Sequence, residues 1–388
     1  MGKLEGKYGA AVLAIVMILA VFGVAAMHWL HPIEFYIYSS EGISYDKAVV
    51  TAIQNENLEL QTGETNRYLG TQNIVVRMEN GEFAGQEKKI SNNLSTTHNI
   101  LVRQGQRVVV KVDHPENTEA FLTVYNYDRT LGIALVVLFF AAFMVLVGGA
   151  KGAKSLLGLL FMLFFIVVGM IPMIYNGTSP ILACLITVLI STTVSMILLN
   201  GFGVKTLVAI LATIIGVTAA ALIFALFAQM LHLSGFNLDE AEELILISES
   251  TGLNISQMLF VSIVIASLGA VMDMTMSIAS ALYEMKAVNP AMTSGEIVRS
   301  GMNIGRDMIG TMSETLILAF AGTAVTTMII VLSYGASFDQ MLSSDYVAME
   351  ILQAVTGSVA VILSVPLTAL LSGRIFTGTE KNQDSAQE

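Results

Sequence analysis

The sequence SLGAVMDMTMSIASALYE, residues 267–284, places a single acid, Asp273, in the middle of a run of Ala, Val, Met, Ile and Leu. No Lys or Arg lies within this run. Apolar runs of about 18 or more residues with few charges are typical of helices that cross a membrane. The stretch therefore predicts a membrane-spanning helix, and it raises the question of why such a helix carries an isolated carboxylate.

The composition of the whole chain supports the same class of protein. Of its 388 residues, 54% are hydrophobic and only 13% are charged, whereas about 25% of residues are charged in soluble proteins. We predict an α-helical polytopic membrane protein with about eight transmembrane helices. The expected spans are 8–28, 131–149, 155–175, 179–200, 206–230, 256–284, 308–334 and 347–372. The first span could be a cleavable signal peptide, but its apolar run is longer than a signal core and favours an uncleaved anchor.

The basic residues predict the orientation of these spans. The segments expected inside contain Lys3, Lys7, Lys151, Lys154, Lys205, Lys286, Arg299, Arg306, Arg374 and Lys381. The short loops expected outside, at 176–178, 231–255 and 335–346, contain neither Lys nor Arg. Because cytoplasmic loops are enriched in basic residues, both termini are predicted to lie in the cytoplasm.

This topology divides the chain into four parts. They are an N-terminal anchor (1–28), an extracytoplasmic domain (29–130), a bundle of seven helices (131–372) and a cytoplasmic tail (373–388). The second part is predicted to be β-rich, because it contains short alternating runs and an Asn80-Gly81 hairpin signal. A further turn is expected at Gly105. Such short strands fit an OB-like barrel, although a sandwich also fits them.

The helix around Asp273 has one polar face. Gly269, Asp273, Ser277, Ser280 and Glu284 recur every three or four residues, which places them on one side of a helix. Small and hydroxyl-bearing residues allow close approach of neighbouring helices in a membrane. We therefore expect this face to meet other helices or water rather than lipid.

The next span carries a similar face, formed by Asn303, Arg306, Asp307, Thr311 and Glu314. Arg306 and Asp307 are expected near the inner interface together with Asn303 and Glu284, where charged side chains can reach water.

Signals for the start of this helix precede that face. A capping box from Thr293 to Glu296 predicts a short cytoplasmic helix before the span. Gly301 and Gly305 predict close packing or a bend.

Asp273 and Glu314 are the candidate coupling residues. Neither has a basic residue close to it in sequence, and a charged side chain near the bilayer centre costs about 2.5 kcal/mol or more. Protonation, a bound cation or water would remove that cost, so the two acids could titrate during transport. Ser277, Ser280 and Thr311 are candidates to line the same path. The simpler alternative is a protonated acid that hydrogen-bonds Ser277 or Thr311 and holds two helices together.

Several other kinds of chemistry are disfavoured by the sequence. The chain has one cysteine, Cys184, and no HExxH or GxSxG motif. We expect no catalytic site, no metal site, no cofactor and no nucleic-acid partner. The expected partners are the lipid bilayer and a small solute or ion, with a protein bound by the exported domain as the alternative.

Two C-terminal stretches and one N-terminal stretch resemble a known family. LGAVMDMTMSIASALYE (268–284), SGMNIGRDMIGTMSETLILAFAG (300–322) and VRMENGEFAGQEKKISNNLS (76–95) are similar to the YibE/F-like family of bacterial multi-pass membrane proteins. This resemblance implies a bacterial plasma-membrane protein and a transport role. It assigns no catalytic or substrate-binding residue.

Three function classes follow, and we place a proton- or cation-coupled transporter or permease first. The second class is a membrane scaffold or accessory protein whose exported domain recruits a partner. An intramembrane aspartyl protease is the least favoured, because the chain has no Gly-x-Gly-Asp motif and one of its two acids is Glu.

Overall fold

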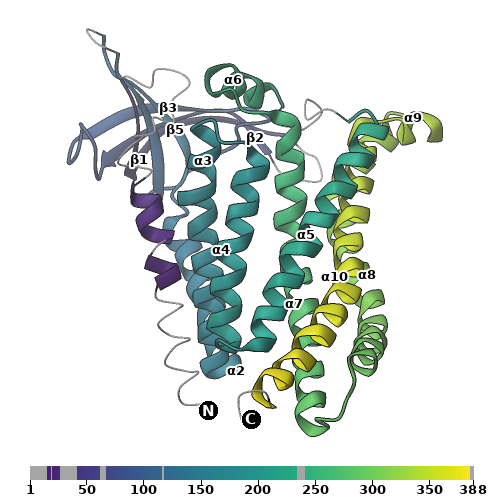
Figure 1. Cartoon of the computed structure of the whole chain (residues 1–388). Coiled ribbons are helices and arrows are strands. Elements are labelled where there is room, and N and C mark those ends of the chain that lie inside the picture. Colours follow the sequence, from purple (N-terminus) through teal and green to yellow (C-terminus); the bar gives the residue numbers. More distant parts are fainter. Residues whose placement is uncertain are drawn as a thin grey trace. The chain divides into compact units, whose positions relative to one another are not determined.

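The computed structural model describes residues 15–18, 20–26, 42–61, 67–115, 118–233 and 241–384. The described chain forms two compact units, Phe35–Phe143 and Met1–Glu34 with Met144–Glu388. The first unit contains a β-sheet and the start of a long helix, and the second contains a helical bundle (Figure 1).

The first unit contains a small, curled, antiparallel five-stranded sheet. Its strands are β1 (Ile43–Gln61), β2 (Arg67–Met78), β3 (Glu87–Leu94), β4 (Arg107–Asp113) and β5 (Phe121–Tyr127). They lie in the order β3-β2-β1-β4-β5. The first part of β1 pairs with β4 and most of its length pairs with β2. Two register shifts in β1 bend this shared strand and let the sheet curl.

Alternating side chains build the core of the sheet. In β4, Val108, Val110 and Val112 point inward and are at most 1% exposed.

The predicted hairpin between β2 and β3 is confirmed. Gly81 has a φ of 81°, and a β-carbon there would collide with the carboxylate of Asp46. The predicted turn at Gly105 is also confirmed, with a φ of 84°.

The helical unit contains the helices long and apolar enough to cross a membrane. Six such candidate spans occur in the described residues: Thr130–Tyr175, Pro180–Asn200, Val204–Met230, Ile255–Val288, Ser294–Ser333 and Asp345–Thr377. The elements are α2 (Thr130–Phe164), the π-helix η1 (Phe165–Met170), α3 (Ile171–Tyr175), α4 (Pro180–Asn200), α5 (Val204–Met230), α6 (Ala241–Thr251), α7 (Ile255–Val288), α8 (Ser294–Ser333), α9 (Phe338–Leu342) and α10 (Asp345–Asp384). A shorter apolar helix, Ile15–Ala26, precedes the sheet. The remainder of the predicted first span lies outside the described residues.

The first candidate span is interrupted at Gly149, whose φ of 55° and ψ of −138° are not helical. A β-carbon on Gly152 would collide with the carbonyl oxygen of Met144. In a continuous helix these two residues would lie ~12 Å apart. The chain therefore turns back on itself here, at the junction predicted between residues 149 and 155.

Three helices, α5, α7 and α10, pack against one another, and α8 packs most extensively on α10. Gly301 of α8 touches Ala369 and Leu282, and Gly305 touches Val365. The predicted close approach at this pair of glycines is confirmed. The predicted short helix before the span was wrong, because α8 runs unbroken from Ser294 to Ser333. Helix α10 continues to Asp384, so the described part of the predicted tail is helical.

The core of the bundle contains many buried hydroxyl groups. They belong to Thr187, Ser191, Thr192, Ser195, Thr206, Thr213, Ser267, Thr275, Thr356, Ser358, Ser364, Thr368 and Ser372. The hydroxyl oxygens of Thr213 on α5 and Thr275 on α7 lie 2.8 Å apart. Each also lies within hydrogen-bond distance of a carbonyl of its own helix, Ala209 O at 2.9 Å and Met272 O at 3.0 Å.

Candidate functional site

Helix α7 has two faces of different character. Its inward face carries Val271, Met274, Ile278 and Leu282, all fully buried. Asp273 and its neighbour one turn away, Ser277, lie on the opposite face and are exposed on the single chain. We expected the polar face to meet other helices or water, and no helix in the described residues covers it. Larger apolar side chains occupy the inward positions, where close van der Waals packing stabilises contacts between membrane helices.

Helix α8 exposes the residues that the sequence singled out. Asn303, Arg306, Asp307, Thr311 and Glu314 are all exposed on the single chain. The helix is held to α10 through its opposite side, where Gly301 and Gly305 are buried.

The carboxylates of Asp273 and Glu314 make no hydrogen bond or ion pair with any residue that the structure describes. The Thr311 hydroxyl donates instead to the carbonyl of Met308 on its own helix, at 3.1 Å. The structure therefore does not contain the predicted alternative in which Ser277 or Thr311 bonds an acid and ties two helices together. Arg306 and Asp307 likewise form no ion pair with each other.

Packing contacts set the relative depth of Asp273 and Glu314. Gly301 of α8 lies beside Leu282 of α7. Counting 1.5 Å per residue from that contact puts Asp273 ~14 Å and Glu314 ~20 Å along their antiparallel helices. Measured along the two helices from this contact, the positions of the two acids thus differ by roughly one helical turn. They come from two helices that both pack on α10.

Several polar side chains lie at the C-terminal end of α7, next to the loop that leads to α8. Glu284 lies 3.8 Å from the ammonium of Lys205 on α5, while Ser280 is half-buried. Lys286 is 9% exposed and donates to the carbonyls of Pro290 and Met292 in the α7–α8 loop. A groove of about 620 Å³ lies beside this loop, lined by Glu284, Met285, Val288, Asn289, Met292, Glu296 and Ser300. The capping box of Thr293 and Glu296 is present here as predicted.

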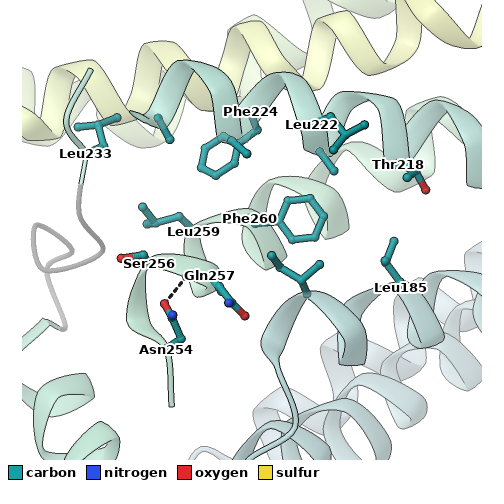
Figure 2. Close-up of a pocket in the computed structure, with 14 residues that line it drawn as sticks. Leu185, Thr218, Leu222, Phe224, Leu233, Asn254, Ser256, Gln257, Leu259 and Phe260 are labelled. Carbon is teal, nitrogen blue, oxygen red and sulfur yellow. Dashed lines mark hydrogen bonds between the residues drawn. The ribbon is translucent and has the colours of Figure 1, made fainter. Parts of the chain in front are cut away.

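A second cavity was not predicted from the sequence. It has a volume of about 390 Å³ and lies between α4, α5 and α7 (Figure 2). Its residues are scattered over three helices, and only their packing brings them together.

Within the described part of the chain, no group of three His, Cys, Asp or Glu residues is close enough to hold a metal ion.

The two units match two family models. Residues 136–378 match the YibE/F-like protein model, and residues 37–127 match the YibE/F family N-terminal domain. The chain belongs to the YibE/F family. In this YibE/F chain, the N-terminal match coincides with the sheet, and the longer match includes Asp273, Glu314 and the cavity between α4, α5 and α7. Comparisons with curated proteins and with solved structures yielded no match.

Proposed function

We propose that this YibE/F protein is a membrane transporter or permease, coupled to protons or cations through Asp273 and Glu314. The observation that carries the proposal is the position of these acids. Both lie at similar depth on the exposed faces of long apolar helices, without a hydrogen-bond or ionic partner among the described residues. Intramembrane acids that face a cavity or water are commonly functional.

The physical argument concerns the cost of charge in hydrocarbon. A carboxylate that faced lipid would be strongly disfavoured, and proton uptake, cation binding or hydration relieves that cost. Each of these is a change of state that a transport cycle can use. In this proposal Ser277, Ser280 and Thr311 line the path, and Glu284, Asn303, Arg306 and Asp307 lie at its inner end.

The proposal includes the orientation and the number of spans. The distribution of Lys and Arg favours cytoplasmic termini in a bacterial plasma membrane and an extracytoplasmic sheet domain. The break at Gly149 divides the longest apolar stretch into two spans, and helix Ile15–Ala26 adds another, which supports a total of eight. The long strand β1, shared between β2 and β4, supports an OB-like barrel.

The test is proton flux into proteoliposomes that contain a pH-sensitive dye, driven by an imposed membrane potential. Asp273→Asn and Glu314→Gln keep size and hydrogen-bonding capacity but cannot titrate. We expect each to abolish coupled flux while thermal stability stays near that of the wild type, because neither carboxylate has a hydrogen-bond or ionic partner among the described residues. The double variant should be little worse than either single variant, because groups that act as one unit are not additive.

Asp339→Asn serves as the control, since Asp339 is an exposed acid on the short helix α9, outside the candidate spans. It should retain the flux of the wild type. Wild-type flux in both Asp273→Asn and Glu314→Gln would eliminate the coupling role.

A second candidate function is a scaffold that binds a protein through the sheet domain. Its support is an exposed aromatic cluster: Tyr45 and Tyr125 meet edge to face with ring centroids 4.8 Å apart, and Phe121 is 68% exposed. Exposed aromatics are enriched in protein interfaces. Under this alternative, replacing Tyr45 and Tyr125 by Ser would remove the cellular phenotype, whereas Asp273→Asn would not.

A further inference from the structure

The cavity between α4, α5 and α7 has a polar end and an apolar body (Figure 2). Its polar side chains at one end are Asn254, Ser256 and Gln257, where α7 begins. Its remaining lining is mostly Ile, Leu, Phe and Ala from α4, α5 and α7. None of the lining residues carries a charge.

The polar end is held in place by hydrogen bonds. The Ser179 hydroxyl donates to Oε1 of Gln257 at 2.8 Å, which links the start of α4 to α7. The Asn254 side chain accepts from the backbone N–H of Gln257 at 3.3 Å and caps α7. The amide groups at this end are therefore fixed before any ligand arrives, which lowers the entropic cost of binding.

Two phenylalanine rings form part of the wall on the bundle side. The ring centroids of Phe224 on α5 and Phe260 on α7 lie 6.4 Å apart, and both side chains are at most 4% exposed. Together with Ala221, they line the cavity and also line a much smaller void of about 10 Å³ next to it. A void of this size is close to the space that one water molecule needs.

The small void is lined by a hydroxyl that lacks a partner. Thr356 of α10 is 1% exposed, and its Oγ1 has no hydrogen-bond partner among the residues that the structure describes. Ser267 lies in the same void and donates to carbonyls of its own helix. A buried hydroxyl without a partner costs about 1–3 kcal/mol, so Thr356 is a group that a ligand atom or a water would satisfy.

We infer that this cavity is the entrance vestibule for an uncharged amphipathic solute and that the Phe224–Phe260 pair gates its passage to Thr356. The inference rests on the proposed transport function and names its substrate class. A charged ligand is disfavoured because the wall offers no counter-charge. An apolar ligand without a polar end would leave Asn254, Gln257 and Thr356 without new partners.

The test measures access of thiol reagents to single cysteines in the full-length protein in liposomes, in a Cys184→Ser background. Ala221→Cys reports the vestibule, Thr356→Cys reports the void behind the gate, and Leu226→Cys, on α5 but outside the cavity lining, is the control. The reagents are methyl methanethiosulfonate, which is uncharged, and its cationic trimethylammonium and anionic sulfonate analogues. We also add 1-octanol or octanoate as probes that differ in charge.

We expect methyl methanethiosulfonate to modify Ala221→Cys at least about tenfold faster than Leu226→Cys, and the charged reagents to show no such preference. 1-Octanol should slow modification of Ala221→Cys, whereas octanoate should not. Thr356→Cys should react slowly until Phe260→Ala opens the gate, which should raise its rate by about tenfold, since access scales with the open fraction. Phe260→Leu, a milder change that preserves packing, should also raise the rate of modification of Thr356→Cys.

Three outcomes would overturn the inference. Equal rates at Ala221→Cys and Leu226→Cys would identify the cavity as lipid-filled. Faster reaction of the cationic or anionic reagent at Ala221→Cys would contradict the uncharged substrate class. If the rate of modification of Thr356→Cys is unchanged in both Phe260 variants, Phe260 does not gate access to Thr356. Repeating the assay in Asp273→Asn separates the two proposals, because the vestibule should persist even where coupled flux is lost.

Discussion

The backbone N–H of Thr130, the first residue of α2, donates a hydrogen bond to Oδ1 of Asp128 across 3.0 Å. The Asp128 side chain is only 7% exposed, and its Oδ2 lies 3.4 Å from the ammonium of Lys47 on β1. Lys47 also donates to the hydroxyl of Thr130 at 3.1 Å. These contacts join β1 and the residue that follows β5 to the start of α2.

This junction predicts an acid-sensitive stability. Hydrogen bonds from the side chain and backbone of Thr130, together with Lys47, hold the pKa of Asp128 below its usual value. A lowered pKa means that the stabilisation is complete above the unfolded pKa of about 3.9 and is lost as the pH falls through the folded pKa. In urea unfolding of fragment 32–130, Asp128→Asn should be less stable than wild type by about 1 kcal/mol at pH 7. The difference should begin to shrink as the pH falls below the unfolded pKa of about 3.9, and a difference that stayed constant down to the lowest pH at which the fragment folds would contradict this assignment.

The same fragment should fold alone as a β-rich unit, and Gln72 tests its core. Gln72 is fully buried and accepts from the N–H of Val102 at 3.0 Å and the amide of Asn92 at 3.1 Å. Gln72→Leu leaves those donors without that acceptor and should lower the free energy of unfolding by about 1–3 kcal/mol. Asn73→Leu, the same kind of change at an exposed neighbouring position of β2, should change it by less than about 0.5 kcal/mol. A disordered circular dichroism spectrum of the parent fragment would show that the sheet depends on the helical unit.

The packing of α8 on α10 predicts different tolerance at two glycines. A β-carbon at Gly305 would collide with Val365, whereas Gly310 has open space around it. Gly305→Val should therefore destabilise the full-length protein in detergent by about 1–3 kcal/mol, the typical cost of overpacking. Gly310→Val, with the same change of side chain on the same helix, should melt near the wild-type temperature. Equal melting temperatures of the two variants would show that α8 does not pack this way in the membrane.

The proposed orientation predicts opposite labelling at two exposed positions. Val288, at the end of α7, and Tyr334, just after α8, are each 86% exposed. In a Cys184→Ser background, an impermeant maleimide should label Tyr334→Cys in intact cells and Val288→Cys only after permeabilisation. Labelling of Val288→Cys in intact cells would reverse the orientation.

The sequence predicted the apolar helices well, because a long hydrophobic run has few other structural outcomes. It also located the hairpin at Gly81, the capping box at Thr293 and the close contacts of Gly301 and Gly305. Each of these depends on residues that are near in sequence or on a backbone conformation that favours one residue type. The continuous helix of Ser294–Ser333 was missed because helical propensity does not indicate where the bilayer ends.

The arrangement of the site was less predictable for a physical reason. Small and hydroxyl-bearing residues occur on both faces of α7, so their spacing alone could not show which face turns inward. The packing of Val271, Met274 and Ile278 decides that question, and it depends on α5 and α10. The cavity beside Phe260 depends on three helices at once, which no local pattern records.

The Thr213–Thr275 contact has a consequence for how α5 and α7 can move. Together the two hydroxyls have two protons to donate. The acceptors within reach are the partner hydroxyl and two backbone carbonyl oxygens, Ala209 O and Met272 O. If the helices separate, each proton still bonds to a carbonyl of its own helix, and no donor is left unsatisfied in the core. The bond between the helices can therefore break at low energetic cost, so this hydrogen bond adds little resistance to relative movement of α5 and α7.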